Sequence, residues 1–247
     1  MPAFTGWPDN ALEFYEGLEA DNSRAYWLEH QDVYEHAVRA PMEALLAELR
    51  DEFGEGRLFR PYRDTRFSRD KSPYKTAIAA TVGDCYVQLS AGGLLAGAGT
   101  YHMAPDQLER YRAAVAADRP GRALQRVLDD LGAAHLEVGA VETLKTAPRG
   151  YPKDHERIAL LRHKGLVARR GWPPAAWLAS AGAKTRVVEV FRAAAPLVTW
   201  LETHVGPSDD HGAAGPGRSG RAARAGRAGR AGQAARAGQV ARAGQAR

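Results

Sequence analysis

Apolar residues recur every three or four positions between residues 9 and 53, which predicts a group of helices. Asn22 or Ser23 is placed to cap the second of these helices, because short polar side chains accept hydrogen bonds from free amides at a helix start. Pro41 lies inside the longest helical stretch and is expected to kink or split it. Gly54 marks the end of the helical region.

The pattern changes to short apolar runs between residues 57 and 103. Each run has the length of a strand and is bounded by glycine-containing turns. The expected strands cover residues 76–82, 85–90 and 94–103. Connections as short as Gly83-Asp84 join antiparallel neighbours, since parallel strands need a long crossover. We therefore expect an antiparallel sheet in this part of the chain.

Helical spacing returns after residue 104 and alternates with short strand-like runs. Pro196 is expected to break the last helical stretch. The expected helices cover 105–117, 122–131, 152–165 and 173–205, and the expected strands lie at about 136–145 and 166–168. Helices, then strands, then helices predict an α+β fold, with an antiparallel sheet flanked by N-terminal and C-terminal helices.

The composition changes at Pro207, after which alanine, glycine, arginine and glutamine dominate. This segment carries eight arginines and two aspartates, a net charge of +6, which leaves −1 for residues 1–206. It has too few apolar side chains to offset the entropy of ordering. We expect residues 1–206 to form one domain and residues 207–247 to form a disordered tail.

Charge, hydropathy and cysteine content narrow the class of protein. The nearly neutral body gives no support in bulk charge for nucleic-acid binding. No run reaches the roughly 20 apolar residues of a membrane helix, and no signal peptide is visible. The single cysteine, Cys85, excludes an internal disulfide and is expected to be a small core residue. These features indicate a cytoplasmic protein without a membrane partner.

The most informative segment spans residues 60–75. Its sixteen residues hold four arginines, two lysines, two aspartates and two tyrosines. The ionisable and aromatic members that we single out as candidate ligand-binding residues are Arg60, Arg63, Arg66, Asp70, Lys71 and Tyr74. Guanidinium groups bind phosphate and carboxylate groups with two hydrogen bonds at once. The segment is therefore a candidate anion site or a structural network of ion pairs.

This segment also resembles a known family. From Arg60 to Tyr74 its residues fit the pattern R-x-x-R-D-x-R-F-x-x-[DN]-K-x-x-Y. That pattern is the signature of a bacterial family called domain of unknown function 2461. Residues 4–7, 150–155 and 160–165 are similar to other stretches of the family. The resemblance covers about residues 4–206, implies a whole-domain protein and supplies no known activity.

The carboxylates of the segment allow two interpretations. Asp64 and Asp70 could pair with the neighbouring arginines and hold a structural corner. Alternatively they hold the arginines in place, so that one or two cations face a pocket. Tyr74 would then donate a hydrogen bond to a ligand or stack on a flat one. In the second case Asp64 is also a candidate to move protons.

A second group of polar residues lies between residues 145 and 164. Tyr151 belongs to a rigid Gly-Tyr-Pro turn, and Asp154 and His155 lie near the expected start of a helix, where anions are stabilised. His155 is the best candidate for a general acid or base, because histidine changes charge near neutral pH. The alternative is a helix capped by Asp154 beside a solvated histidine.

Together the two groups predict a domain that binds an anionic small molecule, phosphorylated or carboxylated, in a shared cleft, whether or not it also catalyses a reaction. One alternative is a nucleic-acid-binding protein that uses this loop and the arginine-rich tail. Another is a structural or interaction protein held by an arginine–aspartate network. The sequence contains no metal-binding motif and identifies no cofactor.

Overall fold

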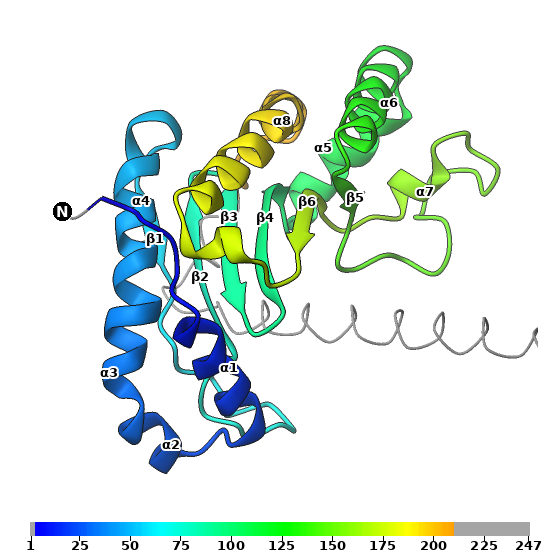
Figure 1. Ribbon diagram of the computed structural model, residues 1–247. Helices are drawn as coiled ribbons and strands as arrows, with labels where there is room; N and C mark the ends of the chain where they lie inside the picture. Colours follow the sequence, from blue (N-terminus) through cyan, green and yellow to red (C-terminus); the bar gives the residue numbers. More distant parts are fainter. Residues whose placement is uncertain (1–2, 210–247) are drawn as a thin grey trace, which may run out of the picture. The chain divides into compact units, whose positions relative to one another are not determined.

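A computed structural model of the protein describes residues 3–209, in which helices pack against a sheet (Figure 1). The α-helices are α1 (Asn10–Ala20), α2 (Arg24–Glu29), α3 (Gln31–Val33), α4 (Ala40–Phe53), α5 (Pro105–Ala116), α6 (Asp118–Ala133), α7 (Ile158–Leu161) and α8 (Gly182–His204). A π-helical turn, η1 (Tyr34–Arg39), and a 3₁₀ turn, η2 (Ala176–Ala179), complete the helical elements. The strands are β1 (Gly56–Leu58), β2 (Ala77–Val82), β3 (Cys85–Ser90), β4 (Gly93–Thr100), β5 (Glu137–Gly139) and β6 (Leu166–Trp172).

The six strands form one sheet in the order β1-β2-β3-β4-β6-β5, and every neighbouring pair is antiparallel. Strands β2, β3 and β4 follow one another through the two short turns that the sequence predicts. Strand β6 is inserted between β4 and β5, although β5 precedes it in the chain. The α+β class and the antiparallel sheet are therefore confirmed.

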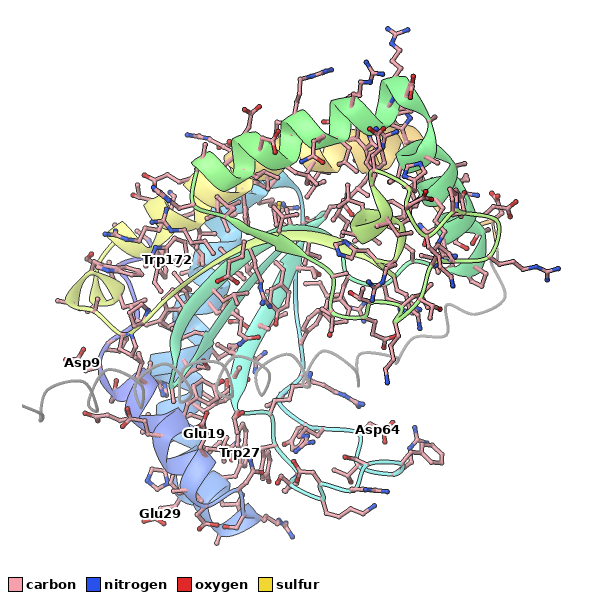
Figure 2. All side chains as sticks on the ribbon, turned by 90° about the vertical axis from the view of Figure 1, so that its right-hand side faces the viewer. Asp9, Glu19, Trp27, Glu29, Asp64 and Trp172 are labelled. Carbon is pink, nitrogen blue, oxygen red and sulfur yellow. The ribbon has the colours of Figure 1, made fainter. Side chains whose placement is uncertain are left out.

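The helices gather on one face of the sheet. Helix α8 packs on β4 and β6, α4 packs on β1 and β2, and α1 packs on β3. Strand β3 shows the division: Cys85, Val87 and Leu89 are buried toward the helices, while the alternate residues are half-buried on the other face. In Figure 2 the strands lie in front of helix α4, so the view looks onto this second face. Within residues 3–209 no helix packs on it, and we call it the open face.

The long N-terminal helix differs from the expectation at Pro41. The chain stays helical from α3 through η1 into α4, and the proline occupies the first turn of α4. A proline lacks the N–H that an α-helix needs in its interior. The π-helical turn ends directly before α4, and wider turns of this kind re-arrange the hydrogen bonds around such a position. The helix is therefore re-wound locally and is not split.

Two further helical predictions were wrong. Helix α8 continues through Pro196, because Ala194, Leu197 and Trp200 on either side of the proline are buried in the core. Packing of this apolar face outweighs the loss of one hydrogen bond. The helix expected over residues 152–165 is reduced to the four residues of α7.

The asparagine and serine before α2 have separate roles. Ser23 caps α2, since its hydroxyl accepts a hydrogen bond of 3.1 Å from the amide of Tyr26. Asn22 instead bonds to a residue of the 60–75 segment, as described below.

The predicted tail lies almost wholly outside the described residues, so its disorder and the domain boundary at Pro207 stay predictions. The last described residues bind α5: Ser208 donates to Asp106, and Asp209 pairs with Arg110. Among residues 3–209 no helix combines the length and the apolar character needed to cross a bilayer.

Candidate functional site

The 60–75 segment forms a loop between β1 and β2, at one edge of the sheet. Its two arms pair like a short extension of the hairpin. The amide of Arg63 donates to the carbonyl of Pro73 at 2.8 Å, and the amide of Lys75 donates to the carbonyl of Pro61 at 2.7 Å. Tyr62 and Tyr74 face each other in an antiparallel bridge between these bonds. The base of the loop is therefore fixed by the backbone.

An aromatic stack anchors the same base to the helices. Tyr74 is 5% exposed, and its ring stacks on Trp27 of α2 with centroids 4.4 Å apart and planes only 6° from parallel. Asn22 clamps the backbone of Tyr74 from the other side: its side chain accepts from the Tyr74 amide at 3.0 Å and donates to the Tyr74 carbonyl at 3.2 Å. Tyr74 thus packs in the core, whereas the sequence analysis proposed it as a ligand contact.

The first ion pair of the loop joins Arg63 to Asp70. Their nitrogen and oxygen atoms are 2.8 Å apart. Asp70 also accepts from the hydroxyl of Ser72 at 2.6 Å and from its amide at 3.0 Å. The Ser72 hydroxyl, followed by the Arg63 guanidinium, holds the pKa of the Asp70 carboxyl well below its usual range. This carboxylate is fully occupied by the loop itself.

The second ion pair joins Arg66 to Asp64. Arg66 donates two parallel hydrogen bonds, of 3.0 and 2.8 Å, to the two carboxylate oxygens. These bonds, and a third from the Arg66 amide, lower the pKa of Asp64 to about 2. Asp64 is consequently ionised and occupied at neutral pH, which makes it a poor proton carrier. Lys71 donates to the carbonyl of Thr65 at 2.9 Å. The arginine–aspartate network of the structural alternative is therefore present.

Two cations at the base of the loop remain without such partners. Arg60 is exposed and Lys75 is half-buried, and neither forms an ion pair with any acid of residues 3–209. The ammonium nitrogen of Lys75 lies 5.5 Å from the centre of the Phe59 ring. Burial, followed by repulsion from the charge of Arg60, lowers the pKa of Lys75. The charge of Arg60 also favours the ionised form of Asp64, whose oxygens Arg66 already holds.

These two cations border the open face of the sheet. Tyr74 faces the helices, so the next residue, Lys75, points to the opposite side. Phe59, which Lys75 contacts, lies 6.4 Å from Tyr86 of β3, a residue on the open face. Phe59 and Lys75 were not among the site residues predicted from the sequence. One signal was available in the sequence. Neighbouring residues of an extended segment point to opposite sides, so a lysine directly after an inward-facing Tyr74 lies on the other side.

The second group of polar residues does not join the first. The 60–75 loop enters β2 at Ala77, which pairs with Ser90, whereas residues 140–165 enter β6 at Leu166, which pairs with Thr100 at the opposite end of the sheet. Strands β1 and β6 are also four positions apart, or about 19 Å at 4.8 Å per strand. Both views show α7 apart from the loop that carries Asp64 (Figures 1 and 2). The predicted shared cleft is not formed.

The three candidates of the second group have separate environments. His155 accepts a hydrogen bond of 3.0 Å at Nδ1 from the amide of Arg157, so it caps the turn before α7. Asp154 is exposed, and Tyr151 is partly buried against the hydrophobic core. A helix of four residues has no appreciable dipole, which removes the reason to expect an anion at its start.

Arg157 is the structural residue of this region, and the sequence analysis missed it. Its side chain is 7% exposed and donates to the carbonyls of Val115 and Ala116 at 2.6 and 3.1 Å, where α5 meets α6. Gly121 leaves room for the Arg157 side chain, because a Cβ at position 121 would lie 2.6 Å from the Arg157 Nε. A surface hollow of about 410 Å³ lies beside it, lined by Arg122, Gln125, Arg126, Glu156 and Arg157.

Two further groups have unusual environments. Cys85 is buried, and burial raises the pKa of its thiol to about 12, which is the behaviour of a core residue. His163 carries a buried Nδ1 with no hydrogen-bond partner among the described residues. Burial, then the charge of Arg162, lowers the pKa of His163. Neither group lies on the 60–75 loop.

A family model described as "Conserved hypothetical protein (DUF2461)" matches residues 10–200, which include all six strands and both polar groups. The chain belongs to the DUF2461 family. No curated protein and no solved structure matches it. The family match confirms the resemblance seen in the sequence.

Proposed function

We propose that this DUF2461 protein binds an anionic small molecule, phosphorylated or carboxylated, between Arg60 and Lys75 at the border of the open face. The observation that carries the proposal is the environment of Lys75. It is half-buried, has no acidic partner within residues 3–209 and lies near a second cation. A partly desolvated charge without a counter-charge is unfavourable. An anion held by both side chains removes that cost.

The rest of the loop supports this role by holding the two cations in place. Arg63 and Arg66 are each neutralised by an aspartate, so we assign them to bracing of the loop and not to contact with the ligand. The aromatic stack on Trp27 and the clamp from Asn22 fix the segment that leads into Lys75. A site whose residues are fixed in advance loses less entropy on binding.

The test is a thermal-shift titration with inorganic phosphate, pyrophosphate and small dicarboxylates at constant ionic strength. An anion at a hundredfold excess over its dissociation constant stabilises by about 2.7 kcal/mol. For a protein of this size that corresponds to a rise of about 5–11 °C in Tm. Lys75→Met and Arg60→Ala should abolish the shift. Arg69→Ala is the matched control, since Arg69 is an exposed cation of the same loop. Equal shifts in all variants would refute the proposed site.

A second candidate function is nucleic-acid binding, and one observation favours it. Phe67, at the tip of the braced loop, is 97% exposed, and the guanidinium of Arg66 lies 6.0 Å from its ring. Exposed rings beside cations stack on bases of single strands. The test is fluorescence anisotropy with short DNA and RNA strands at several salt concentrations. Affinity should fall steeply with salt, weaken in Phe67→Ala and weaken further without residues 207–247.

We also infer a cytoplasmic location, because the single cysteine is a buried free thiol and not half of a disulfide.

A further inference from the structure

We propose that Lys75 is a nucleophile that forms a Schiff base with the carbonyl carbon of an anionic aldehyde or ketone, while Arg60 holds the carboxylate or phosphate group of the same molecule. This inference rests on the proposed function, because it places the reacting carbonyl in the same anion site. It adds a substrate class, small carbonyl compounds with a negative charge, and a covalent step.

Lys75 differs from the other five lysines of the chain, all of which are described by the structure. Lys164 and Lys184 pair with glutamates at 3.3 and 2.6 Å, so their ammonium groups are stabilised in the charged form. The other three are exposed to solvent: Lys71, Lys145 and Lys153. Only Lys75 combines partial burial, a neighbouring cation and no acidic partner within residues 3–209.

That combination is the one that prepares an amine for attack. A lysine reacts with a carbonyl through its neutral amine, and it becomes neutral near physiological pH when it is desolvated or lies beside another positive charge. Burial withdraws Lys75 from water, and Arg60 supplies the positive charge. Lys75 still reaches the surface, since it is half-buried and not enclosed. A small molecule can therefore approach the nitrogen.

The atoms and electrons of this step balance with Lys75 and the carbonyl compound as the only reactants and water as the by-product. The Nζ lone pair of Lys75 forms a bond to the carbonyl carbon, and the carbonyl oxygen takes up a proton to give a carbinolamine. The C–O bond of this intermediate then breaks, and the oxygen leaves as water with both amine protons. The product is an imine between Nζ and the former carbonyl carbon. No oxidant or reductant takes part, and Arg60 keeps the anionic end of the molecule in place throughout.

The experiment traps the imine on the full-length protein. The protein is incubated at neutral pH with glyoxylate or glycolaldehyde phosphate in the presence of sodium cyanoborohydride, which reduces an imine to a stable secondary amine. Peptide mass spectrometry then gives the rate of alkylation at each of the six lysines. We expect Lys75 to be labelled at least tenfold faster than Lys153, an exposed lysine. Labelling of Lys75 no faster than Lys153 overturns the inference.

The control variants separate the two roles. Arg60→Ala should slow the labelling of Lys75 by glyoxylate but not by acetaldehyde, which carries no charge. Equal effects on both reagents would refute anion holding by Arg60. In Lys75→Arg, which keeps the cation but not the nucleophile, total labelling should fall to the level of the exposed lysines. Circular dichroism confirms that each variant is folded.

The dependence on pH gives an independent readout. Labelling of Lys75 should reach its plateau at a lower pH than labelling of Lys153. The charged group that acts on Lys75 is Arg60, while Asp64 lies near Arg60, and Tyr86, the phenol of β3, lies near Phe59. Burial raises the pKa of Tyr86 well above its ordinary value, and Asp64 stays ionised. Neither Asp64 nor Tyr86 titrates between about pH 6 and pH 9, so the profile reports on Lys75. Coincident profiles for the two lysines would count against the inference.

Failure of this inference and failure of the proposed function can be told apart. Inorganic phosphate has no carbonyl group, so its thermal shift and the effect of Arg60→Ala on that shift test anion binding alone. A phosphate shift without selective labelling leaves the anion site and removes the nucleophile. Absence of any anion shift removes both the anion site and the role of Arg60 proposed here.

Discussion

The clamp from Asn22 gives the sharpest test of how the candidate site is held. Its side-chain amide makes two hydrogen bonds to the backbone of Tyr74, 52 positions away in the chain, at 3.0 and 3.2 Å. Both bonds are lost in Asn22→Ala. The change should therefore loosen the segment that carries Lys75 while leaving the rest of the core intact.

The expected loss follows from the value of each bond. A hydrogen bond within a protein contributes about 0.5–1.5 kcal/mol net, so two bonds give about 1–3 kcal/mol. For a protein of this size each kcal/mol lowers Tm by about 2–4 °C. A fall of about 6 °C in Tm, measured by differential scanning calorimetry, is therefore the central expectation. Hydrogen exchange should accelerate at the Tyr74 amide, which donates to Asn22.

Two further variants test whether the effect comes from the Asn22 clamp itself. Ser23→Ala removes the neighbouring cap of α2, so it should lower Tm without changing exchange at Tyr74. Asn22→Asp keeps an acceptor for the Tyr74 amide but sets a carboxylate against the Tyr74 carbonyl, so it should fall between Asn22→Ala and the wild type. A Tm within 1 °C of the wild type in Asn22→Ala, with unchanged exchange at Tyr74, would refute the clamp.

Three further outcomes are expected. Arg157→Met should lower stability by about 2–4 kcal/mol in chemical denaturation, because the buried carbonyls of Val115 and Ala116 lose their donors. His163, whose pKa is lowered by burial, binds a proton more readily in the unfolded chain, so its contribution to stability is present above about pH 6.5 and is lost as the pH falls. His163→Gln should therefore flatten the fall in Tm between pH 7 and pH 5, and an unchanged slope would contradict this. Phe67→Ser should leave Tm within about 1 °C, since the ring is 97% exposed.

Local patterns predicted most of the fold. The helices and the β2-β3-β4 hairpins depend on spacing and on two short turns, which the sequence displays directly. The place of β6 between β4 and β5 could not be predicted in this way, because it depends on pairing between segments far apart in the chain. The continuation of α8 through Pro196 has the same origin: the buried face on either side outweighs a local preference.

In the candidate site, too, local features could be predicted from the sequence and contacts between distant segments could not. The pairing of Asp64 with Arg66 is local, and the sequence analysis offered it as one of two interpretations. The environment of Lys75 depends on the β1–β2 pairing that sets Phe59 beside it. The binding of Arg157 to α5 spans 42 positions and left no pattern in the sequence. Contacts between distant segments thus decided which charged residues are candidates for function.

Strand β6 comes late in the chain but pairs with β4, so β4 waits for its partner during synthesis. On the ribosome β4 is complete long before Leu166, and its edge has no partner while α5, α6 and β5 are synthesised. An apolar edge left open in this way invites pairing with other chains. Gly97 and Gly99, two of the three glycines of β4, weaken its strand propensity during that interval. A lower strand propensity reduces the tendency of this open edge to pair with other chains before β6 is made.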